Sequence, residues 1–314
     1  MPKERSGDVG SRASAAAQGV VGRTREVELV VAALGARRHV VLEGPPGTGK
    51  STLLRSVAQS FGVSFVFVEG NAELTPSRLI GNFDPARVLD EGYAASSFVD
   101  GPLVQALREG ALLYVEEINR IPEETLNVLV TVMSEGEITI PRYGKVTAGD
   151  GFRLVAAMNP FDAVGTARIS SAISDRVCRV AMTYQSLDDE VAIVEHATRG
   201  SVKDFDSAWV RGVVEVARAT RSHPELRVGS SVRGAIDTVM VADQLVAMRG
   251  SAATRDACGK DAAVVSLSGR VRVREGVTRS AESIIEELWD RQFAADERDR
   301  SGKASAPTGA PSRR

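Results

Sequence analysis

The eight residues GPPGTGKS, Gly44 to Ser51, constrain the fold more than any other stretch of the chain. They match the pattern G-x-x-x-x-G-K-[ST], after the apolar run HVVLE and before KSTLLRSVAQSF, which has helical spacing. The glycines let backbone N–H groups face phosphate oxygens without an intervening Cβ, and the start of a helix adds favourable partial charge. The pattern predicts a phosphate-binding loop between a strand and a helix.

Within this loop Lys50 is expected to reach the β- and γ-phosphates, and Ser51 is expected to bind Mg²⁺. The alternative is a glycine-rich turn that connects a strand to a helix and binds nothing. The predicted nucleotide contacts of the loop are Gly44, Pro45, Pro46, Gly47, Thr48, Gly49, Lys50, Ser51 and Thr52.

Four short runs rich in Val, Leu and Phe predict strands: HVVLE (39–43), SFVFVEG (64–70), ALLYVEE (111–117) and FRLVAAMN (152–159). Their near-continuous hydrophobicity favours strands that are buried on both faces of a parallel sheet. The segments KSTLLRSVAQSFG and PEETLNVLVTVMSEG have helical spacing and end on glycine. This alternation predicts an α/β domain.

After about Tyr184 the pattern changes, because four successive segments place apolar residues at helical spacing: 186–200, 206–222, 230–250 and 279–293. We expect an α/β core over residues 19–184 and a small helical domain over 185–297. The segments 1–18 and 298–314 are polar and without periodicity, which predicts disorder at both ends.

Composition excludes several classes of function. The 314 residues carry a formal net charge of -2, which gives no broad electrostatic reason to bind nucleic acid or an anionic membrane. Cys178 and Cys258 lack metal-ligand spacing, and the isolated His39, His196 and His223 support no hydrolase chemistry other than nucleotide cleavage. The sequence shows no signal peptide and no apolar run of roughly 20 residues, so we expect a cytoplasmic protein.

Two adjacent carboxylates, Glu116 and Glu117, end the third apolar run. In a parallel sheet that strand end faces the same crevice as the phosphate loop. Glu116 is expected to hold the Mg²⁺ coordination sphere, and Glu117 to act as general base on the attacking water. Asp is usual at the first position, and strict Mg²⁺ geometry makes the longer Glu116 a departure that could slow turnover. The alternative is a charged strand end without a catalytic role.

The segments GPPGTGKS, EEINRIPEETLNVL, AAMNP and GSSVRGAID together resemble the MoxR-type AAA+ ATPases. That family includes the Rubisco-activating, nitric-oxide-reductase-associated and gas-vesicle-associated ATPases. The resemblance covers about residues 20–293. It implies a P-loop NTPase domain of the AAA+ type, with helices on both faces of a parallel sheet and a helical lid, that binds ATP and Mg²⁺.

The resemblance also implies roles for residues outside the loop. Val21 and Gly22, in VVGRTREVE, are expected to lie against the adenine. Asn159 resembles the sensor that holds the attacking water, although Ala-Met precedes it where Thr-Gln is more usual. Arg233 resembles the second sensor, which touches the γ-phosphate from the lid. Arg120 matches the family text without an assigned role.

The stretch GTARISSAISDRV, residues 165–177, resembles the part of the family that ends near a subunit boundary. Arg176 is the expected arginine finger, which would stabilise transition-state charge on the neighbouring subunit's nucleotide. Arg168 and Arg179 are nearby rivals, and Arg176 could instead only pair with Asp175. The resemblance implies a ring, expected to be a hexamer.

Three further segments bear on partners. The stretch 79–103 resembles the family's insertion within its second helix, and the stretch 137–154 is predicted as a β-hairpin. Both could transmit force near a pore or be plain surface loops. In GRVRVREG, Arg270, Arg272 and Arg274 would make one strand face basic, either to grip an acidic partner or simply as a solvated face. Family members commonly work with a protein that contains a von Willebrand factor A domain.

Three functions follow from these observations. The first is a Mg²⁺-dependent ATPase that forms a ring and remodels or activates a partner protein. The second is an ATP-binding assembly or scaffold component with little turnover, motivated by Glu116. The third, a helicase or clamp-loader relative, rests on shared AAA+ architecture alone, and the near-neutral charge argues against it.

Overall fold

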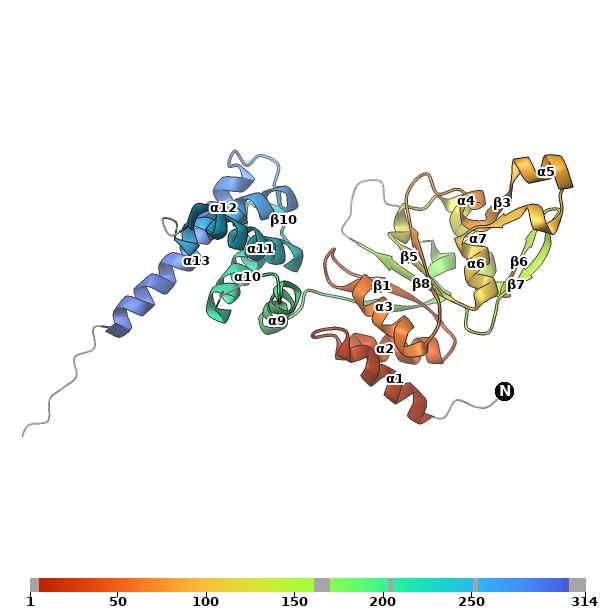
Figure 1. The fold of residues 1–314 in the computed structure, drawn as a ribbon, viewed down its shortest axis with the longest axis horizontal. Coiled ribbons are helices and arrows are strands. Elements are labelled where there is room, and N and C mark those ends of the chain that lie inside the picture. The colour runs from red at the N-terminus through yellow and green to blue at the C-terminus, as the bar shows by residue number, and fades with distance from the viewer. Residues whose placement is uncertain (1–5, 161–169, 203–205, 251–253, 305–314) are drawn as a thin grey trace, which may run out of the picture. The chain divides into compact units, whose positions relative to one another are not determined.

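The computed structural model describes residues 6–160, 170–202, 206–250 and 254–304 (Figure 1). Contacts divide the chain into two units, Met1–Tyr184 and Gln185–Arg314. The first unit has two hydrophobic cores and the second has one. Arg168 lies outside the described residues.

A five-stranded parallel sheet forms the centre of the first unit, in the order β2-β5-β8-β1-β9. The four predicted strands are confirmed, each within one residue of its expected bounds. The fifth strand was not predicted, because the arginine in VCRVA interrupts its apolar pattern. The strands are β1 (His39–Glu43), β2 (Phe65–Glu69), β5 (Leu112–Glu116), β8 (Arg153–Met158) and β9 (Val177–Ala181).

Helices cover both faces of this sheet (Figure 1). One face packs against α1 (Ser6–Gln18), α2 (Thr24–Gly35) and α3 (Lys50–Phe61). The other packs against α4 (Pro76–Ile80), α6 (Pro102–Glu109) and α7 (Glu123–Glu135). Along β5 the buried side chains alternate, so that Leu112 and Tyr114 face α3 whereas Leu113 and Val115 face α6 and α7. This double coverage is why the strands are almost uniformly apolar.

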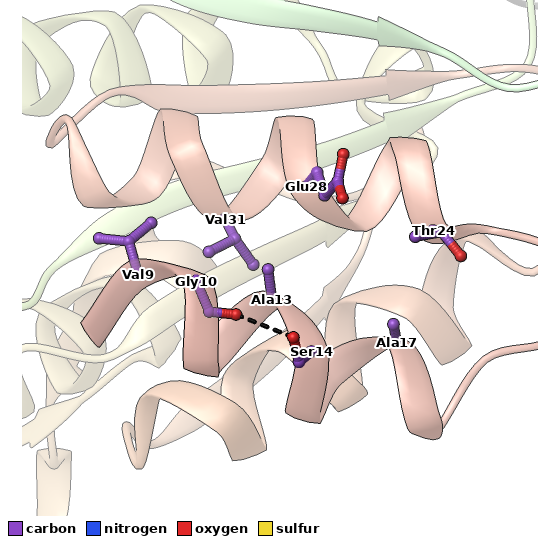
Figure 2. Close-up of a pocket in the computed structure, with 8 residues that line it drawn as sticks. All are labelled: Val9, Gly10, Ala13, Ser14, Ala17, Thr24, Glu28 and Val31. Atoms are coloured by element: carbon purple, nitrogen blue, oxygen red, sulfur yellow. Dashed lines mark hydrogen bonds between the residues drawn. The ribbon is translucent and has the colours of Figure 1, made fainter. Parts of the chain in front are cut away.

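The prediction that residues 1–18 are disordered is wrong for residues 6–18, which form α1. Ala16 is fully buried, and its carbonyl accepts a hydrogen bond from Ser56 Oγ of α3 at 2.7 Å. Small residues at helical spacing let α1 approach α2 and α3 closely, and a composition-based argument overlooks such a stripe. A cavity of about 540 Å³ remains between α1 and α2 (Figure 2), lined by Val9, Gly10, Ala13, Ser14, Ala17, Thr24, Glu28 and Val31.

The two insertions pack against each other. The first contains β3 (Gly81–Phe83), α5 (Pro85–Glu91) and β4 (Phe98–Asp100). The second is the predicted hairpin, confirmed as antiparallel β6 (Glu137–Ile140) and β7 (Gly144–Thr147). The ring of Tyr143 in the hairpin turn lies 4.7 Å from that of Phe98, and Arg142 stacks over Tyr93 at 4.0 Å. Residues 45 and 49 positions apart in the chain are thus in contact, and the two insertions form one small body, which we call the insertion body.

The described residues of the second unit are mainly helical, with a short antiparallel strand pair, β10 (Leu226–Val228) with β11 (Arg272–Val273). The predicted basic strand face is wrong, because β11 spans two residues and Arg270 precedes it and pairs with Asp237. The helices are α9 (Leu187–Thr198), α10 (Ser207–Ser222), α11 (Val232–Arg249), α12 (Arg255–Leu267) and α13 (Ala281–Ala304).

The C-terminal prediction is also wrong in part, because α13 continues to Ala304, into the stretch expected to be disordered from residue 298. Arg298, Arg300, Lys303 and Ala304 in that stretch have high helix propensity, so a helix that is already anchored extends despite Gly302. Residues 305–314 lie outside the described range.

His39 at the start of β1 makes the stability of the first unit depend on pH. Its Nδ1 accepts a hydrogen bond from the Leu154 amide at 2.9 Å. Burial, reinforced by Arg153, lowers the pKa of His39 to about 4. The folded state disfavours the protonated form of His39, so the contribution of His39 to the free energy of unfolding should be fully present above about pH 6.5. It should fall as the pH approaches 4 and then level off, with a loss of up to about 3 kcal/mol.

Thermal unfolding followed by circular dichroism between pH 7.5 and 4 tests this expectation. His39→Asn keeps an acceptor near the Leu154 amide but cannot be protonated, so its unfolding temperature should decline less with falling pH than that of the wild type. The exposed His196 of α9 offers a matched control, and His196→Asn should retain the wild-type slope. Equal slopes in all three proteins would contradict the role of His39.

Candidate nucleotide site

The phosphate loop joins β1 to α3 and folds around the side chain of Lys50. Lys50 is buried, and its Nζ donates to the carbonyls of Gly44 and Pro45, each at 2.8 Å. A Cβ on Gly44 would lie 2.1 Å from the Met182 carbonyl oxygen, so only glycine fits there. Gly49, at φ 84°, turns the chain into α3. The loop therefore places a buried ammonium group at a helix N-terminus, an arrangement suited to phosphate.

The two predicted Mg²⁺ ligands meet at this loop. Ser51, in the first turn of α3, donates from Oγ to Glu116 Oε1 at 3.2 Å. Glu116 is the last residue of β5. A hydroxyl and a carboxylate oxygen are ligands that Mg²⁺ accepts, and they lie beside the group that would bind phosphate. The residues present therefore fit this metal, with Ser51 and Glu116 as the side chains to hold it.

Glu117, the proposed general base, has an unusual backbone. Its φ of 51° and ψ of 44° lie in the left-handed region, which is costly for a residue with a side chain. Its carboxylate pairs with Arg120, with 3.1 Å between Oε2 and Nε. A Cβ on Gly70 would lie 2.5 Å from the Glu117 carbonyl oxygen, so glycine is required at that neighbouring strand end. Arg120, which had no role in the sequence analysis, thus contacts the candidate base.

Asn159 follows β8 directly and is half-buried. In the sheet β8 lies between β5, which ends on Glu116, and β1, which leads into the phosphate loop. The amide therefore lies at the sheet edge between the acidic pair and the loop. This placement is compatible with the predicted sensor role, which stays a prediction.

The segment expected to contact adenine lies between α1 and α2, with Val21 half-buried and Gly22 exposed. Its neighbour Arg23 was missed by the sequence analysis. The Arg23 side chain is 2% exposed, and its Nη2 donates to the carbonyls of Thr48, at 3.0 Å, and Thr183, at 2.6 Å. Arg23 therefore ties this segment to the phosphate loop and to the chain beyond β9. The position of this arginine directly after the apolar residues that begin VVGRTREVE was the feature of the sequence that could have indicated it.

The described candidates for the arginine finger differ in their surroundings. Arg176 is exposed and donates to Ser134 Oγ at 2.6 Å and to the Ala172 carbonyl at 2.7 Å. Arg179 pairs with Glu43, whose pKa it lowers through that hydrogen bond. Both arginines are engaged within their own subunit, but Arg179 is paired with a carboxylate whereas the acceptors of Arg176 are uncharged, which favours Arg176 as the charge available to a neighbour.

Arg233, the predicted second sensor, is the second residue of α11 and is exposed. It belongs to the second unit, so its part in nucleotide binding stays a prediction.

Tyr114 is a second residue that the sequence analysis missed. It lies on β5 two residues before Glu116, is fully buried, and has its hydroxyl 3.1 Å from Ser51 Oγ. Burial raises the pKa of Tyr114 well above its ordinary value, while the hydrogen bond with Ser51 acts in the opposite direction. Tyr114 is thus a neutral phenol next to the candidate metal ligands. An aromatic residue with a hydroxyl in an otherwise aliphatic strand was the only sequence signal.

Comparisons with known proteins agree with this geometry. Residues 39–177 match the family model described as AAA domain (dynein-related subfamily). The gas vesicle ATPase GvpN1 of Halobacterium salinarum is 30% identical over 277 residues, which cover 81% of this chain and 76% of that protein. The chain belongs to the MoxR-type AAA+ ATPase family. Membership of this family implies nucleotide binding, for which the phosphate loop has the required form.

Further matches cover much of the chain. The uncharacterized protein YeaC of Bacillus subtilis is 28% identical over 253 residues, 73% of this chain and 75% of YeaC. The solved structure of a candidate ATPase from Cytophaga hutchinsonii matches with a TM-score of 0.52 at 19% identity, covering 90% of this chain and 93% of that one. The structure of a variant of Thermotoga maritima RuvB also matches with a TM-score of 0.52, at 17% identity. That match covers 78% of this chain and 69% of the RuvB chain. Both structures support the AAA+ fold.

The described residues include no helix with both the length and the hydropathy that a membrane crossing needs.

Proposed function

We propose that this protein is a Mg²⁺-dependent ATPase that assembles into a ring and remodels or activates a partner protein. One observation carries the proposal: the Ser51 hydroxyl lies 3.2 Å from the Glu116 carboxylate, next to the phosphate loop that holds Lys50. Hydroxyl, carboxylate and ammonium groups thus converge where a triphosphate and its metal would bind. Glu117 and Asn159 end neighbouring strands at the same edge.

Each residue has a distinct chemical task in this proposal. When nucleotide binds, the Lys50 ammonium group exchanges its hydrogen bonds to the carbonyls of Gly44 and Pro45 for hydrogen bonds to phosphate oxygens. Ser51 and Glu116 would hold Mg²⁺, which would neutralise charge on the phosphates. Glu117 accepts the proton of the attacking water, and the Asn159 amide orients that water.

The contact between Glu117 and Arg120 bears on the timing of hydrolysis. A carboxylate that is paired with a guanidinium is a poorer proton acceptor than a free one. Glu117 must therefore leave Arg120, or share it, when water is activated. Both side chains are more than a third exposed, so the exchange requires little reorganisation of the core.

The ring, expected to be a hexamer, rests on family membership and on the exposure of Arg176. In such a ring Arg176 would stabilise the charge that develops on the nucleotide of the next subunit. Arg233 would contact the γ-phosphate from the helical unit and so couple the nucleotide state to the angle of that unit.

The insertion body supports a protein partner rather than nucleic acid. It exposes Leu89 at 87%, Tyr93 at 53% and Val99 at 53%, a set of apolar side chains suited to protein contact. The near-neutral net charge of the chain gives no comparable support for nucleic acid. A protein with a von Willebrand factor A domain is the proposed partner on the basis of the family.

A second candidate function is an ATP-binding assembly component with little turnover. Two observations favour it: Glu116 replaces the usual shorter acid, and Glu117 is paired with Arg120. Gas vesicle ATPases among the relatives are compatible with either function.

Purified protein distinguishes these functions. We expect ATP binding and steady phosphate release that require Mg²⁺, and Lys50→Ala should lose ATP affinity by at least about tenfold, since a charged hydrogen-bond donor to phosphate is removed. Tight binding without turnover would favour the assembly component. Absence of ATP binding by the wild type would contradict both functions, and strong stimulation of turnover by DNA would favour a nucleic-acid motor.

A further inference from the structure

The position of Tyr114 on β5 directs its hydroxyl to the metal side of the nucleotide site. Side chains two residues apart in a strand share a face, so Tyr114 and Glu116 point to the side of the sheet covered by α3. Ser51 is the second residue of α3. The rings of Phe65 and Phe67 flank the Tyr114 ring at 5.5 and 5.6 Å between centroids, which fixes the ring against the sheet.

The hydrogen-bond donors and acceptors around Ser51 indicate the role of the Tyr114 hydroxyl. Ser51 Oγ has one proton and two lone pairs, and it donates that proton to Glu116 Oε1 at 3.2 Å. Either hydroxyl can donate in the 3.1 Å contact between Tyr114 and Ser51 Oγ, and Tyr114 is the donor when Ser51 gives its proton to Glu116. Ser51 Oγ is left with one lone pair, and both of its hydrogen bonds restrain its direction. A metal ligand needs such a free pair and such restraint.

We propose that Tyr114 is a positioning residue for Mg²⁺: its phenol orients the Ser51 hydroxyl and thereby adapts the site to Glu116. Glu carries one methylene more than Asp, so its carboxylate is less restrained. Two hydrogen bonds that meet at Ser51 connect the Glu116 carboxylate to the fully buried ring of Tyr114 and so restrain the carboxylate. This inference rests on the proposed function, because it assigns a role within the same metal site.

The test uses the full chain, a fluorescent ATP analogue and Mg²⁺ titrated from a chelated solution. Tyr114→Phe keeps the ring and removes only the hydroxyl. We expect the half-saturating Mg²⁺ concentration for analogue binding to rise about tenfold, as loss of a hydrogen bond behind a metal ligand typically causes. Binding without Mg²⁺ should stay within twofold of the wild type, because Lys50 and the loop are unchanged.

Thr125→Val provides a matched control, since it also deletes a buried hydroxyl, one that donates to the Leu74 carbonyl at 2.7 Å on the opposite face of the sheet. It should leave the Mg²⁺ dependence unchanged. Tyr114→Met, a second variant without the hydroxyl, should repeat the shift and replaces Tyr114→Phe if that variant does not fold.

Three outcomes would overturn the inference. An unchanged Mg²⁺ dependence in the hydroxyl-free variants would contradict the role of Tyr114 while leaving the proposed function intact. An equal shift in Thr125→Val would show a general loss of stability instead. Wild-type binding of the analogue that is insensitive to Mg²⁺ would overturn both the inference and the proposed metal-dependent function.

Discussion

Replacing Glu117 with Gln is expected to lower ATP turnover by at least about 100-fold, because the amide cannot accept a proton from water. ATP affinity should remain close to that of the wild type, since Lys50 and the loop are untouched. Phosphate release measures turnover, and fluorescence of a bound ATP analogue measures affinity. The protein trapped with ATP in this way is also the form with which to capture a partner.

Glu124→Gln is the matched control for this experiment. Glu124 is an exposed acid in the first turn of α7, seven residues beyond Glu117 in sequence. Its substitution should leave turnover unchanged. Persistent hydrolysis in Glu117→Gln, at more than about a tenth of the wild-type rate, would contradict the assignment of Glu117 as general base.

Arg176→Ala is expected to reduce turnover by about 1,000-fold or more, the usual range for an arginine finger, while ATP binding changes little. A distinctive result should follow when the Arg176→Ala protein is mixed with Glu117→Gln protein. Some interfaces then combine an intact Glu117 on one subunit with an intact Arg176 from its neighbour. Partial recovery of hydrolysis at those interfaces requires that Arg176 acts between subunits.

Arg179→Ala serves as the comparison, because Arg179 already pairs with Glu43 inside its own subunit. It should lower turnover less than Arg176→Ala, and it should show no recovery on mixing. If the mixture with Arg176→Ala stays inactive while the mixture with Arg179→Ala recovers, the finger is Arg179 and the assignment is wrong.

Most of the α/β core could be predicted because its strands are buried on both faces. Such strands have a near-continuous apolar pattern that few other structures require, so four of the five were placed within one residue of their bounds. β9 was not predicted because Arg179 interrupts its apolar pattern. α1 was not predicted because its contacts are made mainly by Ala13, Ala16 and Ala17, whose burial a composition of small residues does not indicate.

The candidate site divides in a similar way. The phosphate loop is local, since its residues are consecutive and its chemistry follows from backbone geometry, so Lys50 and Ser51 could be assigned from sequence. Arg23 and Tyr114 could not, because their partners lie 25, 160 and 63 residues away in the chain. Only the packing of strands against helices creates those contacts.

Local residue patterns were enough to predict a phosphate loop, the α/β order of the core and a pair of acids at a strand end, because each depends on residues close together in the chain. The tertiary structure decided which groups face one another: Ser51 with Glu116, Glu117 with Arg120, and Tyr114 behind Ser51. Parallel pairing of β5 with β8, and of β8 with β1, brings these groups to the carboxyl edge of the sheet. Strand order, the physical cause of that convergence, depends on long-range packing that no local pattern specifies.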